Sequence, residues 1–174
     1  MNRKSFINRV AITAGGALTL PYLLNAQTTA PGVKQTPPDA IPPEKVRDFV
    51  GASHGKFDVV KQLLTEFPNL LYCSWDWGGG DFETGLEASG HVGNKEIAHH
   101  LLELGGRPNI FVMTMLGKTE LVKPILEAYP QFLNAKGPHG LTLLHHAQKG
   151  GEDAKELLEY LKAKGMKETK LAMY

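Results

Sequence analysis

The sequence has very little cysteine and no excess of charge of one sign. Cys73 is the only cysteine among 174 residues, so the chain can form no intramolecular disulfide and no thiolate metal cluster. Lysine and arginine number 19 against 18 acidic residues, a formal net charge of +1. A nucleic-acid-binding surface normally shows a basic excess or a basic stripe. We therefore expect neither thiol redox chemistry nor a nucleic-acid partner.

Catalytic signatures and long apolar runs are also scarce. The sequence has no HExxH and no paired-cysteine motif, and the glycine triplet 78–80 lacks the Lys and Ser/Thr of a phosphate-binding loop. The apolar run 11–24 is too short to span a bilayer, which needs about 20 residues. We therefore assign no catalytic residue, metal or cofactor, and we expect a binding protein more than an enzyme.

The first 26 residues have the layout of a signal peptide. Arg3, Lys4 and Arg9 precede the apolar run 11–24, and the segment closes with the small residue Ala26. The segment 3–7 resembles a twin-arginine signal with lysine in place of the second arginine, so twin-arginine and general secretory export both remain open. We expect cleavage near Ala26 and a mature protein in the periplasm or secreted, without stable membrane insertion.

Residues 27–43 form a predicted disordered linker. This segment contains five prolines and few apolar side chains, a composition that cannot bury enough surface to fold. Pro42 and Pro43 would enter the first helix, where the missing N–H group is tolerated. We expect a folded domain over residues 44–166, followed by a C-terminal tail over 167–174.

A self-similar pattern recurs through the folded part. After Gly55, Gly93 and Gly117 the sequence has an acid three residues later and apolar residues at helical spacing, and a looser copy covers 152–158. Each copy predicts an amphipathic helix that follows a glycine turn. Repetition of this kind is typical of proteins built from stacked helix pairs.

These segments resemble ankyrin repeats, whose pattern is a Thr-Pro-Leu-His-x-Ala first helix, a glycine, and a second helix ending in Leu-Leu-x-x-Gly-Ala. Residues 84–89, followed by Gly93 and then 101–106, are similar to one repeat, and 140–147 are similar to the start of another. The resemblance covers about residues 44–165. It implies an all-α solenoid of about four helix pairs whose first helices line a concave face. We expect a monomer that binds another protein through this face.

One connection between the predicted helix pairs is unusually long, and we predict a finger loop over about residues 68–83. It contains both tryptophans and the glycine triplet. Tryptophan gives a large contact area with few rotamers, and glycine lets a backbone approach closely. We expect the finger to anchor the partner protein, although a turn whose tryptophans cover the core remains an alternative. The candidate binding residues in this segment are Trp75, Asp76, Trp77, Asp81 and Glu83.

A second possible function is a metal or small-molecule site that uses Asp81, Glu83, Glu87 and His91. The last three are spaced by four residues, which would place them along one face of a helix. Carboxylates and imidazole could there hold a metal or serve as an acid and base pair. By the resemblance, Glu87 stands where ankyrin repeats carry a structural histidine. A polar structural link between repeats therefore remains open for Glu87.

Two pairs of adjacent histidines complete the set of candidates. His145 stands at the position whose imidazole bonds neighbouring backbone in ankyrin folds, and the resemblance implies a structural role for it. His146 points elsewhere, and we expect it to face the groove as a binding residue. His99 and His100 diverge by about 100° on a helix, so we expect a solvated or packed pair.

Overall fold

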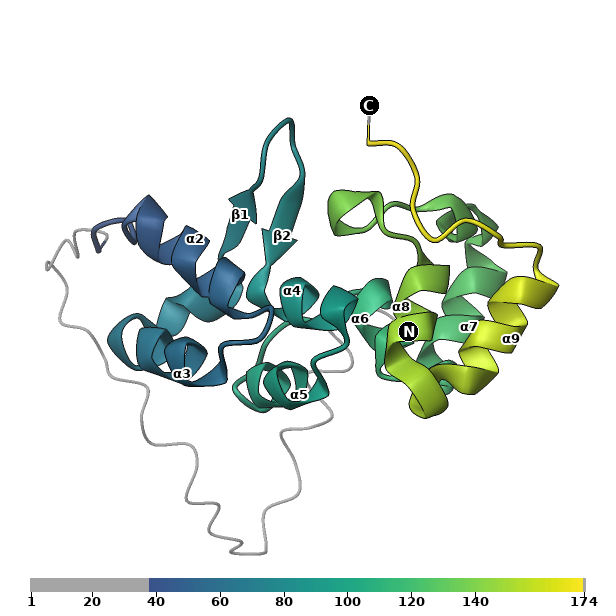
Figure 1. Ribbon diagram of the computed structural model, residues 1–174, viewed down its shortest axis with the longest axis horizontal. Coiled ribbons are helices and arrows are strands. Elements are labelled where there is room, and N and C mark those ends of the chain that lie inside the picture. The colour runs from purple at the N-terminus through teal and green to yellow at the C-terminus, as the bar shows by residue number, and fades with distance from the viewer. Residues whose placement is uncertain (1–37, 174) are drawn as a thin grey trace, which may run out of the picture. The chain divides into compact units, whose positions relative to one another are not determined.

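The structure is a computed structural model that describes residues 38–173 (Figure 1). The predicted signal peptide and residues 27–37 of the predicted linker lie outside the described residues. No helix in the described part of the chain combines the length and the apolar character of a membrane span.

The described chain is mostly helical, which agrees with the predicted all-α class. Eight α-helices are present in this part of the chain: α2 (Pro43–Ala52), α3 (Phe57–Glu66), α4 (Gly85–Val92), α5 (Lys95–Glu103), α6 (Ile110–Met115), α7 (Thr119–Ala128), α8 (Leu143–Gly150) and α9 (Lys155–Ala163). Four short 3-10 helices connect them: η1 (Pro68–Tyr72), η2 (Pro130–Asn134), η3 (Pro138–Gly140) and η4 (Gly151–Ala154). Two short strands, β1 (Ser74–Asp76) and β2 (Phe82–Thr84), form a hairpin.

Consecutive helices pack in pairs: α2 with α3, α4 with α5, α6 with α7, and α8 with α9. The first helices of the pairs also contact one another in the order α2, α4, α6, α8, as Figure 1 shows. Each helix has one apolar face at the 3.6-residue period, which is buried only when a neighbouring helix covers it.

Polar side chains fix where several helices begin. Thr84, Asn94, Asn109 and Thr142 each accept a hydrogen bond from a backbone N–H in the first turn of the helix that follows. Such caps satisfy N–H groups that have no partner inside the helix. Helix α2 begins instead at Pro43, which needs no partner for a backbone N–H.

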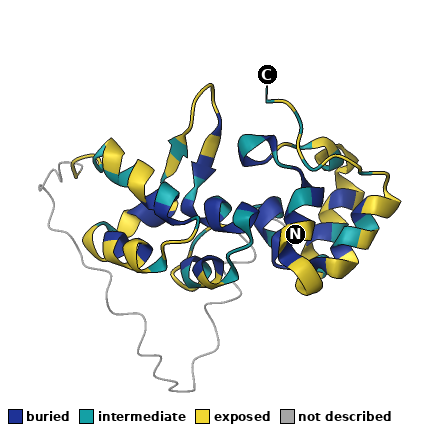
Figure 2. Cartoon of the chain, viewed as in Figure 1, coloured by how far each residue is buried: buried dark blue, intermediate teal, exposed yellow. Residues whose placement is uncertain are grey.

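The buried side chains form two neighbouring clusters, visible in Figure 2 as the dark blue faces where helices meet. The first lies among α2 to α6 and includes Phe49, Leu70, Ile97, Leu101 and Met115. The second lies among α6 to α9 and includes Phe111, Val122, Leu143, Leu157 and Leu161. Helix α6 supplies residues to both clusters, so it joins the two halves of the core.

The predicted finger is shorter than expected. Residues 68–72 form η1, and Leu70 and Leu71 are buried in the first cluster. The projecting part is the hairpin, in which Trp75 pairs with Glu83. The prediction that Glu83 shares a helix face with Glu87 and His91 is wrong, because the cap at Thr84 starts α4 after Glu83.

Candidate metal centre

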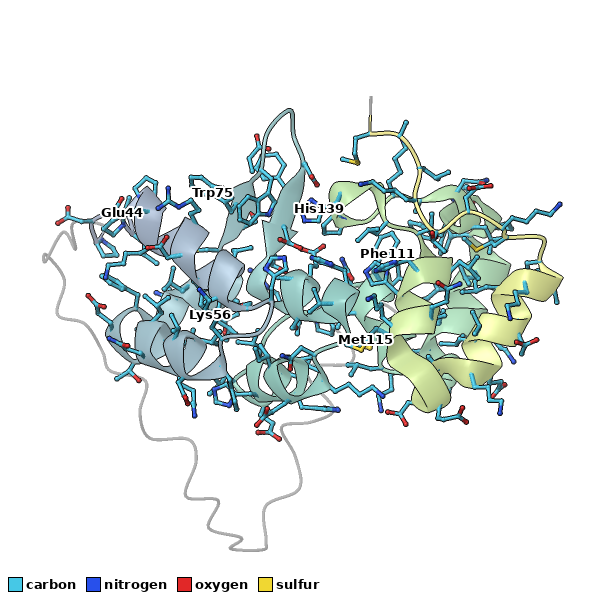
Figure 3. All side chains as sticks on the ribbon, viewed as in Figure 1. Glu44, Lys56, Trp75, Phe111, Met115 and His139 are labelled. Carbon is cyan, nitrogen blue, oxygen red and sulfur yellow. The ribbon has the colours of Figure 1, made fainter. Side chains whose placement is uncertain are left out.

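Four side chains from separate segments converge beside the hairpin. Glu83 belongs to β2 and His91 to the last turn of α4, while His54 follows α2 and His139 lies in η3. One potential ligand atom from each lies within 4.8 Å of the other three. Figure 3 shows His139 between the hairpin and the turn that carries it. Residues far apart in the sequence therefore form one cluster.

The separations within this cluster suit ligands of one ion. His91 Nε2 lies 3.0 Å from His54 Nε2 and 2.8 Å from Glu83 Oε1. Glu83 Oε1 is 3.6 Å from His139 Nε2, and Glu83 Oε2 is 3.6 Å from His54 Nε2. Tetrahedral ligands with bonds of about 2.0 to 2.2 Å lie about 3.3 to 3.6 Å apart. The two distances of 3.6 Å lie at the upper end of this range, and the two that involve His91 are shorter than it.

Hydrogen bonds fix the tautomers of two of the histidines. His54 Nδ1 lies 3.1 Å from the carbonyl oxygen of Val50 and 3.2 Å from that of Gly51. His139 Nδ1 lies 2.7 Å from Asp81 Oδ2. Since these oxygens accept, each Nδ1 donates, and in the neutral ring Nε2 is the nitrogen with the lone pair that a metal needs. Metal-binding histidines usually have such a partner on the second ring nitrogen.

Glu83 is the most buried member of the cluster, with a fully buried side chain. Its Oε2 accepts a hydrogen bond of 2.8 Å from Trp77 Nε1. Its Oε1 accepts no hydrogen bond among the described residues, and its nearest polar neighbour there is His91 Nε2, at the 2.8 Å distance of an ion pair. A buried carboxylate oxygen that accepts no hydrogen bond is destabilising. A cation bound between Glu83 and the imidazoles would remove this cost.

Asp81 orients His139 from outside the cluster. Its carboxylate accepts one hydrogen bond of 2.7 Å from the backbone N–H of His139 and another of 2.7 Å from Nδ1. Burial raises the pKa of Asp81, but the hydrogen bonds from His139 and the nearby charge of Lys170 outweigh it, so this pKa lies below its ordinary value. These contacts hold His139 in a left-handed backbone conformation with φ of 60°, which is uncommon for residues other than glycine.

Two other predicted residues of the hairpin lie outside the cluster. Asp76 Oδ1 accepts hydrogen bonds from the backbone N–H groups of Gly78 (2.8 Å) and Gly80 (3.1 Å), so it stabilises the turn. Trp75 packs against the first core cluster. Of the predicted finger residues, the structure brings Asp81, Glu83 and Trp77 to the site.

Glu87 does not join His91 in the site. Its Oε2 accepts hydrogen bonds from the backbone N–H and the hydroxyl of Thr84, which closes a capping box at the start of α4. Its Oε1 accepts a hydrogen bond from Asn109 Nδ2, and Asn109 itself caps α6. Glu87 is thus a link between two helix starts, the structural role that the sequence left open.

His146 does not face a groove, and that prediction is wrong. Its side chain is buried against Phe111, and its Nδ1 lies 2.8 Å from the Thr142 carbonyl oxygen. Burial lowers the pKa of His146 to about 4, although the hydrogen bond to Thr142 opposes this shift. His145 Nε2 lies 2.8 Å from the carbonyl oxygen of His91. This contact matches the structural role expected for His145.

Sequence reasoning missed His54 and His139. Both lie in turns next to glycine, where the spacing of residues does not predict which side chains meet.

Residues 51–55 read Gly-Ala-Ser-His-Gly, which has the spacing of a nucleophile elbow. In such an elbow the serine lies on a turn between a strand and a helix. Here Ser53 ends α2, is fully buried and donates its hydroxyl to the Phe49 carbonyl. This serine is therefore not placed as a nucleophile.

The comparisons with known proteins give no match: no family model, no curated protein and no solved structure is similar to this chain. The assignment of a function therefore depends on the geometry of the site.

Proposed function

We propose that the protein binds one divalent transition-metal ion through His54, Glu83, His91 and His139, with Asp81 orienting His139. The observation that carries this proposal is the buried Glu83 Oε1, which faces imidazole nitrogens and has no hydrogen-bond donor in the described part of the chain. Three imidazoles and one carboxylate suit zinc and other late first-row metals. Calcium and magnesium prefer ligand sets made of oxygen.

Calorimetric titration of the full chain, first stripped of metal with a chelator, tests this proposal. We expect one Zn²⁺ per chain, and we expect His139→Ala and His91→Ala each to weaken binding at least about tenfold, since each removes one ligand. His99→Ala is the matched control, because His99 is an exposed histidine on α5 outside the cluster.

Two results would contradict the metal proposal. One is equal loss of affinity in His99→Ala and His139→Ala, and the other is full affinity in all variants. Circular dichroism of each apo variant separates a lost ligand from a lost fold.

We also propose that the helix pairs form an ankyrin-type solenoid. Support comes from the contacts between successive first helices, α2 with α4, α4 with α6 and α6 with α8. Thr84 and Thr142 cap α4 and α8 at corresponding positions. A crystal structure tests this proposal, and helix pairs that do not stack in sequence order would reject it.

Protein binding through the hairpin is a second candidate function. We also propose that the protein is exported and that its signal peptide is cleaved near Ala26. The observation that favours it is the exposure of two aromatic side chains, Trp77 and Phe82, which are 41% and 59% exposed. We expect Phe82→Ala to lose a periplasmic partner that the unchanged chain retains on a column, while binding Zn²⁺ normally. Retention of the same proteins by both would reject this role.

Mass spectrometry of the exported protein tests the proposed cleavage near Ala26. We expect a product that consists of residues 27–174.

A further inference from the structure

We infer that the metal in this centre keeps a solvent-facing coordination position beside Trp77, at which a small anion binds in exchange for water. The inference rests on the proposed metal binding and names the ligand class of the same site. It distinguishes an open Lewis-acid centre from a closed structural site, in which the protein fills every position.

The four ligands are buried unequally. The side chain of Glu83 is 0% exposed and that of His91 is 11% exposed, whereas those of His54 and His139 are 31% and 29% exposed. An ion among them would therefore have protein on the side of Glu83 and His91. The opposite side, between the two more exposed imidazoles, faces solvent.

Trp77 borders this open side. Its ring centre lies 6.4 Å from that of His54 and 6.3 Å from that of His139, and the hydrogen bond to Glu83 holds the indole in place. The indole of Trp77 has no atom that could serve as a metal ligand, because its nitrogen only donates. It therefore borders the open side without supplying a ligand.

Two of the separations between ligand atoms are shorter than a tetrahedral site requires. The distances of 3.0 Å from His91 to His54 and 2.8 Å from His91 to Glu83 are close to the roughly 3.0 Å between adjacent ligands of an octahedral ion with bonds of about 2.1 Å. The other two separations, from Glu83 to His139 and to His54, are 3.6 Å, so the four atoms do not form a regular tetrahedron that would close the coordination of an ion. The remaining positions are left for ligands from solution.

The charge of the centre favours an anion there. A divalent ion with one carboxylate ligand and three neutral imidazoles carries a net positive charge, since Glu83 is the only acid among the four ligands in the described chain. The second carboxylate, Asp81, accepts one hydrogen bond from the His139 backbone N–H and one from its Nδ1, so it contacts the ring at the nitrogen that does not face the cluster. In such an environment a small anion is bound more strongly than neutral water, because the charge of the ion dominates the local field.

Azide titration of the Co²⁺-loaded full chain, followed by visible absorption, tests the inference. Cobalt reports its own coordination, and azide is the probe anion. We expect a saturable shift of the cobalt bands with one azide per cobalt, and competition by acetate for the same position. We also expect Trp77→Phe, measured at cobalt saturation, to change azide affinity at least about threefold, since the indole borders this position. His99→Ala should behave like the unchanged chain.

The outcomes separate the two proposals. Bands that stay unchanged at high azide, with cobalt fully bound, would overturn the open position and leave the metal site intact. Failure to bind cobalt at all would overturn both. As a second readout, bound Mn²⁺ should enhance water-proton relaxation if a water exchanges at the ion, and absence of enhancement from bound Mn²⁺ would also count against an open position.

Discussion

At the scale of single residues, His146 shows what burial does to a titratable group. Its Nε2 has no hydrogen-bond partner among the described residues, and burial lowers its pKa from 6.5 to about 4. Between these pH values the unfolded chain binds more protons than the folded chain. The stability that depends on neutral His146 is therefore fully present above about pH 6.5 and is lost as the pH falls toward 4.

We expect this loss to reach about 3 kcal/mol, at about 1.4 kcal/mol per pKa unit. Urea denaturation of the metal-free chain at several pH values measures it. His146→Asn is the comparison, because its amide can replace Nδ1 as the donor to the Thr142 carbonyl oxygen but does not titrate. The free energy of unfolding of this variant should depend less on pH over this range. Equal pH dependence of the two proteins would show that His146 does not titrate as its burial requires.

Glu83 and Glu87 should respond to substitution in opposite ways. Glu87→Ala removes the capping box and the contact with Asn109, so we expect the free energy of unfolding to fall by about 1 to 3 kcal/mol with zinc affinity unchanged. Glu83→Gln keeps the shape but removes a charged ligand, so we expect zinc affinity to fall at least about tenfold. Denaturation and calorimetry on both variants measure this contrast, and a loss of zinc affinity in Glu87→Ala would contradict it.

Part of the site could be predicted from the sequence, but the reasoning placed it wrongly. Glu83, Glu87 and His91 were predicted to share one helix face. The structure brings only Glu83 and His91 into the cluster, because Glu83 lies on a hairpin strand that contacts α4. Helical spacing describes contacts inside one element only. His54 and His139 reach the site through turns, and no periodicity in the sequence indicates such long-range contacts.

At the scale of elements, the packing of one turn against another depends on a glycine. Gly117 follows α6 with a φ of +68°, and a Cβ there would overlap the Asp153 carbonyl oxygen in η4. Gly165 also has a positive φ, +90°, but a Cβ there would meet nothing within 4 Å. Alanine at Gly165 would therefore add backbone strain alone, whereas alanine at Gly117 would add the same strain and a steric clash.

We expect Gly165→Ala to cost about 1 kcal/mol, the usual penalty of an alanine in the left-handed region, and Gly117→Ala to cost clearly more. The added cost arises because η4 must move away from α6. Thermal or urea denaturation of the two variants measures the difference. Equal destabilisation by the two substitutions would show that η4 and the turn after α6 move apart at no measurable cost in free energy.

The elements themselves were more predictable than their contacts. Amphipathic runs after Gly55, Gly93 and Gly117 became α3, α5 and α7, because a helix that buries one face needs apolar residues at a period of 3.6. Residues 68–72 were assigned to a loop but form η1, since Leu70 and Leu71 bury against the core. So short a segment has too few residues for a period to be recognised.

At the scale of the whole molecule, metal binding should stabilise the fold. A ligand that binds only the folded state raises stability by about 2.7 kcal/mol when its free concentration is 100 times its Kd. We therefore expect Zn²⁺ at that level to raise the melting temperature of the full chain by several degrees. His139→Ala should lose this increase and His99→Ala should keep it. An increase that persists in His139→Ala would assign the effect to another site.

The positions of His54 and His139 also bear on chain entropy. Together they enclose the hairpin, α3 to α7 and the connections between them, so an ion bound to both would act as a reversible cross-link. A covalent cross-link that closes a loop of 100 residues is worth about 4.7 kcal/mol in the chain-entropy model. A chain with one cysteine cannot form such a link as a disulfide. A chelator would open this link, as a reductant opens a disulfide.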